Sequence, residues 1–260
     1  MTHKKFETAL NVLRLAALVI FGMGIASALV FGSEPHKDLT KYGVPDGSGH
    51  VRGSYLLSID GRTRSANWIL ERLDRGSLAA KVDRDTESFR PDPGTGEEFR
   101  ATAVDYRGSG FDIGHLAPAN NHRTSQADLD STFLFSNAAP QLPQFNRGLW
   151  KSLESEVHET AKEFPLWVIT APLWIPEKGK LSVETIGPNG VWIPSHCGKC
   201  VLMERNDKVE LKAWIMPNRD LKGRDLEEFT VSVDQFEKAA GFDCWAGLPD
   251  DVEKRLEGAK

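Results

Sequence analysis

The chain has 260 residues, of which 40% are hydrophobic and 27% are charged, a composition that excludes disordered and collagen-like chains. This length favours a single core of roughly 200 residues, large enough to bury most of its apolar surface. The formal net charge of -5 argues against binding of polyanions through an overall basic surface. A local basic groove is still compatible with this net charge, because several arginines and a lysine lie at residues 84–151.

The first 31 residues have the features of a targeting or membrane segment. Basic residues come first, an apolar run follows at residues 15–31, and Ala-Ser-Ala at residues 26–28 offers a small-residue cleavage pattern. We interpret residues 1–31 as a signal peptide or, if uncleaved, as a short membrane anchor. The expected location is therefore exported, periplasmic or membrane-anchored. A mitochondrial presequence, which would place the protein in the intermembrane space, is the alternative, and a buried core helix is a further one.

Residues 32–49 are rich in glycine, proline, aspartate and serine and are expected to be a linker, so the folded domain is expected at residues 50–260. Two β-prone runs at residues 55–59 and 68–73 are connected through Asp60-Gly61, which predicts an antiparallel hairpin. Residues 84–98 contain two prolines and two glycines without periodicity and are expected to form a loop.

The second half of the chain predicts four more strands and one helix. Residues 231–240 carry apolar side chains at helical spacing. The strands are expected at residues 166–171, 191–195, 201–204 and 210–216. Together these elements predict a mixed α+β fold with a largely antiparallel sheet.

Three cysteines leave several interpretations open. Cys197 and Cys200 have the CxxC spacing of redox and zinc sites, although a single pair without a second ligand pair is a weak indication of zinc. A disulfide within this motif or to Cys244 would be consistent with an exported protein. Three ordinary thiols are the favoured interpretation.

Asn146 and Glu154 carry the first indication of a metal site. Asparagine after Pro143 is a favoured helix N-cap, so we expect a helix to begin at Asn146. Positions eight apart project from one helix face with Cα atoms about 12 Å apart, too far for both side chains to bind one magnesium directly. Glu154 could instead hold a water on a magnesium bound by Asn146. A plain N-cap and a solvated charge are the alternatives.

His115 is the candidate base. It stands among apolar residues, where a histidine is usually a satisfied, partly buried imidazole. Beside a metal-held phosphate, the neutral imidazole could take a proton from water. No serine or cysteine stands out with a paired histidine and acid, so direct attack by water is the simpler mechanism.

Several motifs in order carry a family resemblance. They are DIGH at residues 112–115, SNAAPQ at 136–141, NRG at 146–148 and WKSLE at 150–154, with further matches at 39–43, 106–112 and 119–123. This set closely resembles the DNA/RNA non-specific endonucleases with a ββα-metal finger, and within them the endonuclease G group. The resemblance extends from about residue 39 to residue 242 and implies the ββα finger as the active site.

The resemblance also implies roles for single residues. His115 would be the general base, Asn146 the direct magnesium ligand, and Glu154 the holder of a metal-bound water, with Mn²⁺ as a substitute metal. Asn137 would help to organise the site, and Arg84 would stabilise charge on the scissile phosphate. DNA and RNA would be substrates, cleaved to 5′-phosphate and 3′-hydroxyl ends, and a homodimer is the implied assembly.

One position departs from the family pattern. The signature is Asp-Arg-Gly-His, and Ile113 replaces the arginine, which could cost about 2 to 4 kcal/mol of transition-state stabilisation. Nearby arginines could compensate and contact substrate: Arg107, Arg123 and Arg147. The alternative function is therefore a catalytically weakened nucleic-acid-binding protein of the same family, and a CxxC redox or zinc module is a third hypothesis.

Overall fold

A seven-stranded sheet forms the centre of the computed structural model, which describes residues 38–83, 88–206 and 208–256. Each strand in it pairs antiparallel with its neighbours, in the order β1-β2-β3-β6-β9-β10-β11. The strands are β1 (His50–Arg52), β2 (Tyr55–Asp60), β3 (Ser65–Leu73), β6 (Leu166–Leu173), β9 (His196–Arg205), β10 (Lys208–Pro217) and β11 (Thr230–Val231). The predicted α+β class with a largely antiparallel sheet is confirmed.

The predicted hairpin is present as β2 and β3. Its turn follows Asp60, whose side chain accepts a hydrogen bond from the backbone N–H of Arg62 at 2.8 Å. Such aspartate turns stabilise the reversal of the chain without help from distant residues. This explains why the pattern was readable in the sequence.

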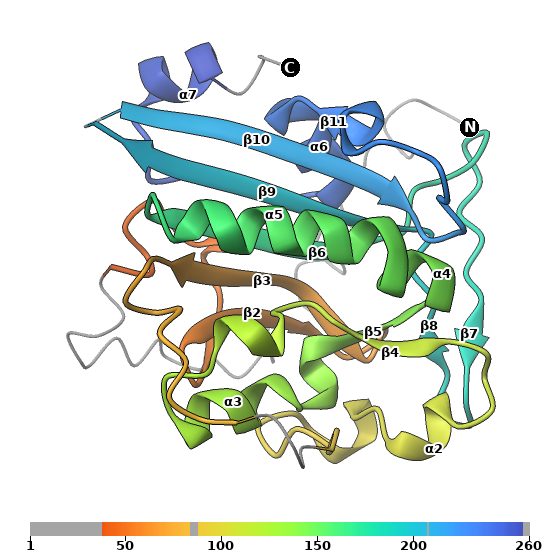
Figure 1. The fold of residues 1–260 in the computed structure, drawn as a ribbon. Coiled ribbons are helices and arrows are strands. Elements are labelled where there is room, and N and C mark those ends of the chain that lie inside the picture. The colour runs from red at the N-terminus through yellow and green to blue at the C-terminus, as the bar shows by residue number, and fades with distance from the viewer. Residues whose placement is uncertain (1–37, 84–87, 207, 257–260) are drawn as a thin grey trace, which may run out of the picture. The chain divides into compact units, whose positions relative to one another are not determined.

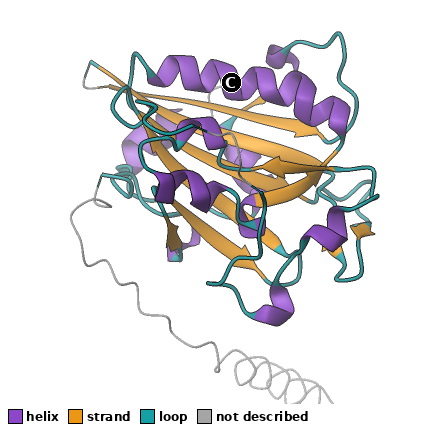
Figure 2. Ribbon diagram, turned by 60° about the horizontal axis from the view of Figure 1, so that its bottom comes forward, coloured by secondary structure: helices purple, strands orange, loops and turns teal. Residues whose placement is uncertain are grey.

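Helices cover both faces of the sheet (Figures 1 and 2). Strand β6 is buried along its whole length. Trp167 and Ile169 belong to the apolar cluster that includes Phe236 of α6 (Val233–Ala240), whereas Val168 belongs to the cluster under α5 (Lys151–Ala161). Because side chains alternate across a strand, these two clusters form one core on each side of the sheet.

Helix α6 confirms the helix predicted at residues 231–240. Ser232 and Gln235 cap its start reciprocally, and Gly241, with a φ of 79°, ends it. A capping box and a left-handed glycine are both local features, so the sequence alone placed this helix to within two residues.

Two short ribbons lie outside the large sheet. The first pairs β4 (Asp112–His115) with β5 (Ala138–Gln141), and the second pairs β7 (Thr185–Ile186) with β8 (Val191–Trp192). The strand predicted at residues 191–195 is therefore only two residues long. The other α-helices of the described residues are α2 (Ala103–Tyr106), α3 (Gln126–Thr132), α4 (Pro143–Phe145) and α7 (Asp250–Leu256).

Residues 38–49 pack against the sheet, although their composition resembles that of a linker. Leu39 is buried in the core, Tyr42 lies edge-on to the Trp167 ring at 4.8 Å, and Asp46 accepts a hydrogen bond from Trp68 at 3.0 Å. The folded unit therefore includes these residues.

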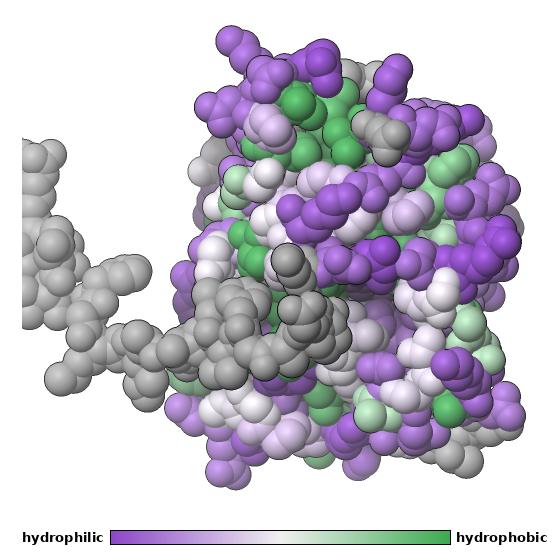
Figure 3. Space-filling model, turned by 90° about the vertical axis from the view of Figure 1, so that its left-hand side faces the viewer, coloured by the Kyte–Doolittle hydropathy of each residue, from purple (hydrophilic) through white to green (hydrophobic). Residues whose placement is uncertain are grey.

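The predicted signal or anchor at residues 1–31 lies outside the described part of the chain. Within that part, no helix combines the length and the apolar character needed to cross a bilayer. The face shown in Figure 3 is mainly hydrophilic, with smaller hydrophobic areas between polar side chains.

The three cysteines are buried free thiols. Cys197 lies in the cluster under α5, whereas Cys200 and Cys244 lie in the cluster on the α6 side. Since residues three apart on a strand point to opposite faces, Cys197 and Cys200 cannot share one zinc ion or form a disulfide with each other. The described residues contain no group of three or more His, Cys, Asp or Glu side chains that could hold a metal.

Candidate active site

A two-stranded ribbon followed by a helix forms the candidate site. Strands β4 and β5 pair antiparallel with His115 opposite Ala138 and Asp112 opposite Gln141. Glycine at position 114 leaves room for the Gln141 side chain, because a Cβ there would lie 2.2 Å from the Gln141 side-chain oxygen. The chain then enters the helical segment that carries Asn146 and Glu154. The ribbon and helix together make the expected ββα arrangement.

The expected start of the helix at Asn146 is wrong. The helical segment begins at Pro143, where proline occupies the first turn as it often does. Asn146 has helical backbone angles and lies in a π-helical turn, Asn146–Trp150, that contains a kink at Gly148. Its side chain therefore does not cap the helix and is available for other contacts.

Helix α5 presents one face to the core and the other to a cleft. Leu153, Val157 and Ala161 are buried at four-residue intervals. The opposite face lines a cleft with a volume of about 770 Å³. Its side chains include Lys151, Glu154, Ser155, His158, Glu159 and Lys162, and the cleft is completed by His115, Asn146, Arg147 and residues 118–121.

Asp112 links the ribbon to the helix. It accepts a hydrogen bond from Asn146 Nδ2 at 2.9 Å and two from the Arg147 guanidinium, at 2.8 and 2.6 Å. Burial opposes ionisation, but the hydrogen bonds from Arg147 and Asn146 outweigh it and lower the pKa of Asp112. Because the Asn146 amide nitrogen is engaged, its carbonyl oxygen is the atom left to act as a ligand.

His115 ends β4 at the wall of the cleft. Its ring lies against two aromatic rings, Phe89 at 4.7 Å and Phe133 at 5.1 Å. Asn137 is fully buried and does not line the cleft. Its amide makes three hydrogen bonds, two to the Ala117 backbone and one to the Thr132 carbonyl. Asn137 thus fixes the backbone two residues from His115.

The structure brings together His115, Asn146, Glu154 and Arg147 but leaves two predicted arginines outside this cleft. Arg107 is exposed after α2, and Arg123 donates to the Val82 carbonyl at 2.9 Å. Neither lines the cleft, and Arg84 is outside the described residues.

Ile113 has an apolar environment. It packs with the half-buried side chains of Phe89, Phe111 and Ile193 against a buried cluster that includes Phe135. The position that carries arginine in the family signature therefore contributes here to the packing between the ribbon and its neighbours.

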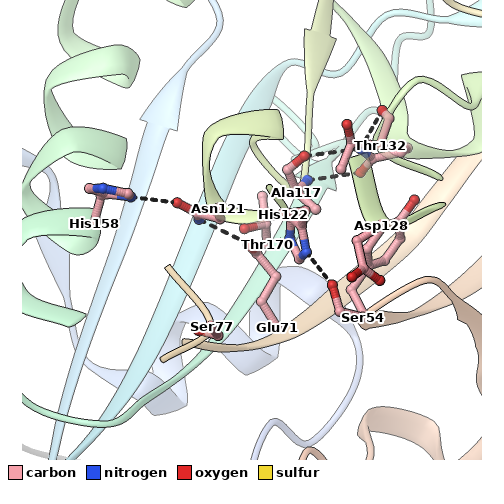
Figure 4. A network of polar contacts seen from close by, with 12 residues as sticks. Ser54, Glu71, Ser77, Ala117, Asn121, His122, Asp128, Thr132, His158 and Thr170 are labelled. Atoms are coloured by element: carbon pink, nitrogen blue, oxygen red, sulfur yellow. Dashed lines mark hydrogen bonds and ion pairs between the residues drawn. The ribbon is translucent and has the colours of Figure 1, made fainter. Parts of the chain in front are cut away.

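Several polar residues near the cleft were not identified as functional in the sequence. Two of them are buried in the sheet, Glu71 on β3 and Lys199 on β9. Glu71 is hydrogen-bonded to Asn121 and His122, and Asn121 is in turn hydrogen-bonded to His158 (Figure 4). The one available indication was an ionisable residue inside an otherwise strand-like run, as with Glu71 between Leu70 and Arg72.

Lys199 lies under the helix that lines the cleft. Its ammonium group donates to Thr170 Oγ1 at 2.5 Å and lies 5.2 Å from the Trp150 ring. Burial lowers the pKa of Lys199, and the charges of Glu71 and Glu154 oppose this change. Lys199 and Glu71 thus place two buried ionisable side chains beneath the cleft.

Comparison with known proteins identifies the family. Residues 35–251 match the DNA/RNA non-specific endonucleases. The chain belongs to this family. Human mitochondrial endonuclease G is 39% identical over 214 residues, which are 78% of this chain and 72% of that protein. Nuclease C1 of Cunninghamella echinulata var. echinulata is 38% identical over 200 residues, which are 73% of this chain and 79% of that protein.

A solved structure extends the similarity to three dimensions. It is the crystal structure of an EndoG/EndoGI complex, and its TM-score is 0.81 at 34% identity over 88% of this chain and 98% of that chain. The relatives are named endonucleases or nucleases. This endonuclease-family chain is accordingly a nucleic-acid hydrolase, and the comparisons do not favour the catalytically weakened binding protein that Ile113 suggested.

Proposed function

We propose that this endonuclease-family chain is a magnesium-dependent, sugar-non-specific enzyme that hydrolyses phosphodiester bonds of DNA and RNA. The observation that carries the proposal is the contact between Asp112 and Asn146, at the edge of a cleft that His115 and Glu154 also line. This contact supports the proposal because it leaves the Asn146 amide oxygen to act as a metal ligand.

The residues available as ligands fit magnesium better than a metal whose ligands must all come from the protein. Asn146 would hold the ion directly, and Glu154 would hold one of its waters. Oxygen ligands and retained waters suit magnesium, with Mn²⁺ as a substitute. When bound, the metal would stabilise charge on the phosphate and on the leaving oxygen.

His115 is proposed as the general base. Its place at the end of β4 is set by backbone pairing with Ala138 and by the Asn137 hydrogen bonds at Ala117. The flanking rings of Phe89 and Phe133 restrict the orientation of the imidazole. A fixed imidazole at the cleft wall can accept the proton of the attacking water.

Basic side chains in the cleft would hold the nucleic-acid backbone. Arg147, Lys151 and Lys162 line the cleft directly. We propose Arg107 and Arg123 as further contacts to the bound strand, and Arg84 as a residue that stabilises charge on the scissile phosphate. Contacts of this kind read phosphates and not bases, so cleavage should have little sequence preference.

The names of the relatives also bear on location and partners. The human and Caenorhabditis elegans relatives are named mitochondrial endonuclease G, which supports the mitochondrial alternative over export to a periplasm. We retain membrane attachment through the N-terminal segment and homodimer formation as proposals. In the EndoG/EndoGI complex, EndoG is inhibited. This supports the proposal that a bound protein could inhibit the present chain as well.

The proposed function is tested by degradation of plasmid DNA and RNA with magnesium. His115→Ala should lower the rate about 10²- to 10⁴-fold, the usual contribution of a general base. His50→Ala is the matched control, because His50 is exposed on β1. This variant should cleave at the wild-type rate. Equal rates for His115→Ala and wild type would remove His115 as the base.

A further inference from the structure

A hydrogen-bond network connects the interior of the sheet to the cleft (Figure 4). Glu71 on β3 is fully buried, and its Oε1 lies 2.9 Å from His122 Nε2 and 3.1 Å from Asn121 Nδ2. The other ring nitrogen of His122 lies 2.7 Å from Ser54 Oγ. On the cleft side, Asn121 Oδ1 lies 2.9 Å from His158 Nδ1.

This network fixes the tautomer of His158. The Asn121 amide nitrogen must face the Glu71 carboxylate, because the reverse orientation would place two acceptors against each other. Asn121 Oδ1 can then only accept, so the proton of the His158 ring is on Nδ1. In the neutral imidazole, Nε2 consequently carries a lone pair and is a hydrogen-bond acceptor.

The acceptor nitrogen belongs to a side chain that lines the cleft. His158 is half-buried on α5, one turn after Glu154. The hydrogen bond that the structure shows for the His158 ring is the one at Nδ1. Burial and the charge of Lys162 lower the pKa of His158, which favours the neutral ring at neutral pH.

Few groups on a nucleic acid can donate to such an acceptor. Phosphate and ring oxygens of the backbone only accept hydrogen bonds. Base edges do carry donors, but these differ from base to base, so a contact with them would read sequence and would not recur along a strand. The remaining backbone donor is the 2′-hydroxyl, which RNA has and DNA lacks.

We propose that His158 Nε2 accepts a hydrogen bond from the 2′-hydroxyl of bound RNA and so raises cleavage of RNA relative to DNA of matched sequence. The inference rests on the proposed nuclease function, in which both nucleic acids are cleaved and His158 sets their ratio. Asn121 and Glu71 are positioning residues, since they act by holding the tautomer of His158.

The test compares kcat/KM for single-stranded RNA and for the same sequence with 2′-fluoro groups, which cannot donate. In wild type, the 2′-fluoro substitution should reduce kcat/KM about five- to ten-fold, as expected for one hydrogen bond. In His158→Ala this penalty should fall below about two-fold. His158→Gln, which keeps an acceptor oxygen, should restore part of it.

Thr160→Ala is the control, because its hydroxyl bonds to the carbonyl of its own helix at Glu156, and it should keep the wild-type penalty. An equal 2′-fluoro penalty in wild type and His158→Ala would overturn the inference. A wild-type protein that cleaves neither substrate would overturn the proposed function instead. Asn121→Ala should also reduce the 2′-fluoro penalty. Its kcat/KM for the 2′-fluoro strand should be closer to the wild-type value than its kcat/KM for RNA is.

Discussion

The Asn146 amide donates a hydrogen bond to the Asp112 carboxylate at 2.9 Å and thereby ties the helix of the ββα unit to its first strand. The two residues are 34 positions apart in the chain. Since the same carboxylate binds the Arg147 guanidinium, Asp112 controls the orientation of a proposed metal ligand and of a cleft arginine together.

Asp112→Asn should weaken the use of magnesium more than it affects folding. The amide of the substituted asparagine has no negative charge and only one acceptor oxygen, so it cannot replace the carboxylate that binds both Asn146 and Arg147. Loss of such supporting contacts usually costs about 10- to 100-fold in metal affinity or activity. A magnesium titration of the cleavage rate measures this as a higher half-saturating concentration. Asp251→Asn, on the exposed surface of α7, is the control, and a similar titration curve for both variants would argue against the role of Asp112.

Ile113→Arg should change kcat/KM by less than about three-fold. Arg147 and Lys151 already provide positive charge in the cleft, and Ile113 packs among apolar side chains that a guanidinium would disturb. Steady-state kinetics on plasmid DNA provides the measurement. A gain of about 10²-fold or more, the size expected for a missing electrostatic group, would show that the natural protein is impaired by Ile113.

Arg147→Gln should reduce the salt dependence of DNA binding. Each lost phosphate contact lowers the slope of log affinity against log salt by about 0.9 for duplex DNA. Binding measured with the His115→Ala protein, to prevent cleavage, should show this decrease. An unchanged slope of log affinity against log salt for Arg147→Gln would exclude Arg147 from the binding surface. Arg107→Gln and Arg123→Gln test separately whether the bound strand extends beyond the cleft.

Gly114→Ala should destabilise the ribbon. The new Cβ would lie 2.2 Å from Gln141 Oε1, and Gln141 is fully buried, so the Gln141 side chain or the ribbon would have to shift. Overpacking of this kind costs about 1 to 3 kcal/mol of unfolding free energy. Urea denaturation should show a lower midpoint. Gly76→Ala is the comparison for glycine replacement outside the ribbon, because Gly76 is exposed in a turn and its new Cβ would approach only the Asp74 side-chain oxygen, at 3.2 Å. Equal midpoints for Gly114→Ala and wild type would contradict the tight pairing.

Local features were predictable from the sequence. The β2–β3 hairpin and helix α6 each depend on neighbouring residues, the Asp60 turn in one case and the Ser232 cap with Gly241 in the other. The candidate site was also recognisable, because His115, Asn146 and Glu154 lie within one continuous stretch.

Other features depend on contacts between distant residues. Glu71 and Asn121 are 50 positions apart, and Asn121 and His158 are 37 apart, so no local pattern connects them. The prediction placed the N-cap at Asn146, whereas the helical segment begins three residues earlier at Pro143, a residue that is itself favoured in a first turn. The π-helical turn that follows has no simple sequence signal. The packing of residues 38–49 depends on Trp68 and Trp167, which a composition resembling a linker could not reveal.

The most direct test of the central claim is a cleavage assay on single-stranded DNA, duplex DNA and RNA with metal-free protein, to which magnesium is then added. The protein should be inactive without metal, and magnesium should restore cleavage of all three substrates in wild type but not in Asn146→Ala at the same magnesium concentration. Cleavage without any divalent metal, or full activity of Asn146→Ala, would contradict the account.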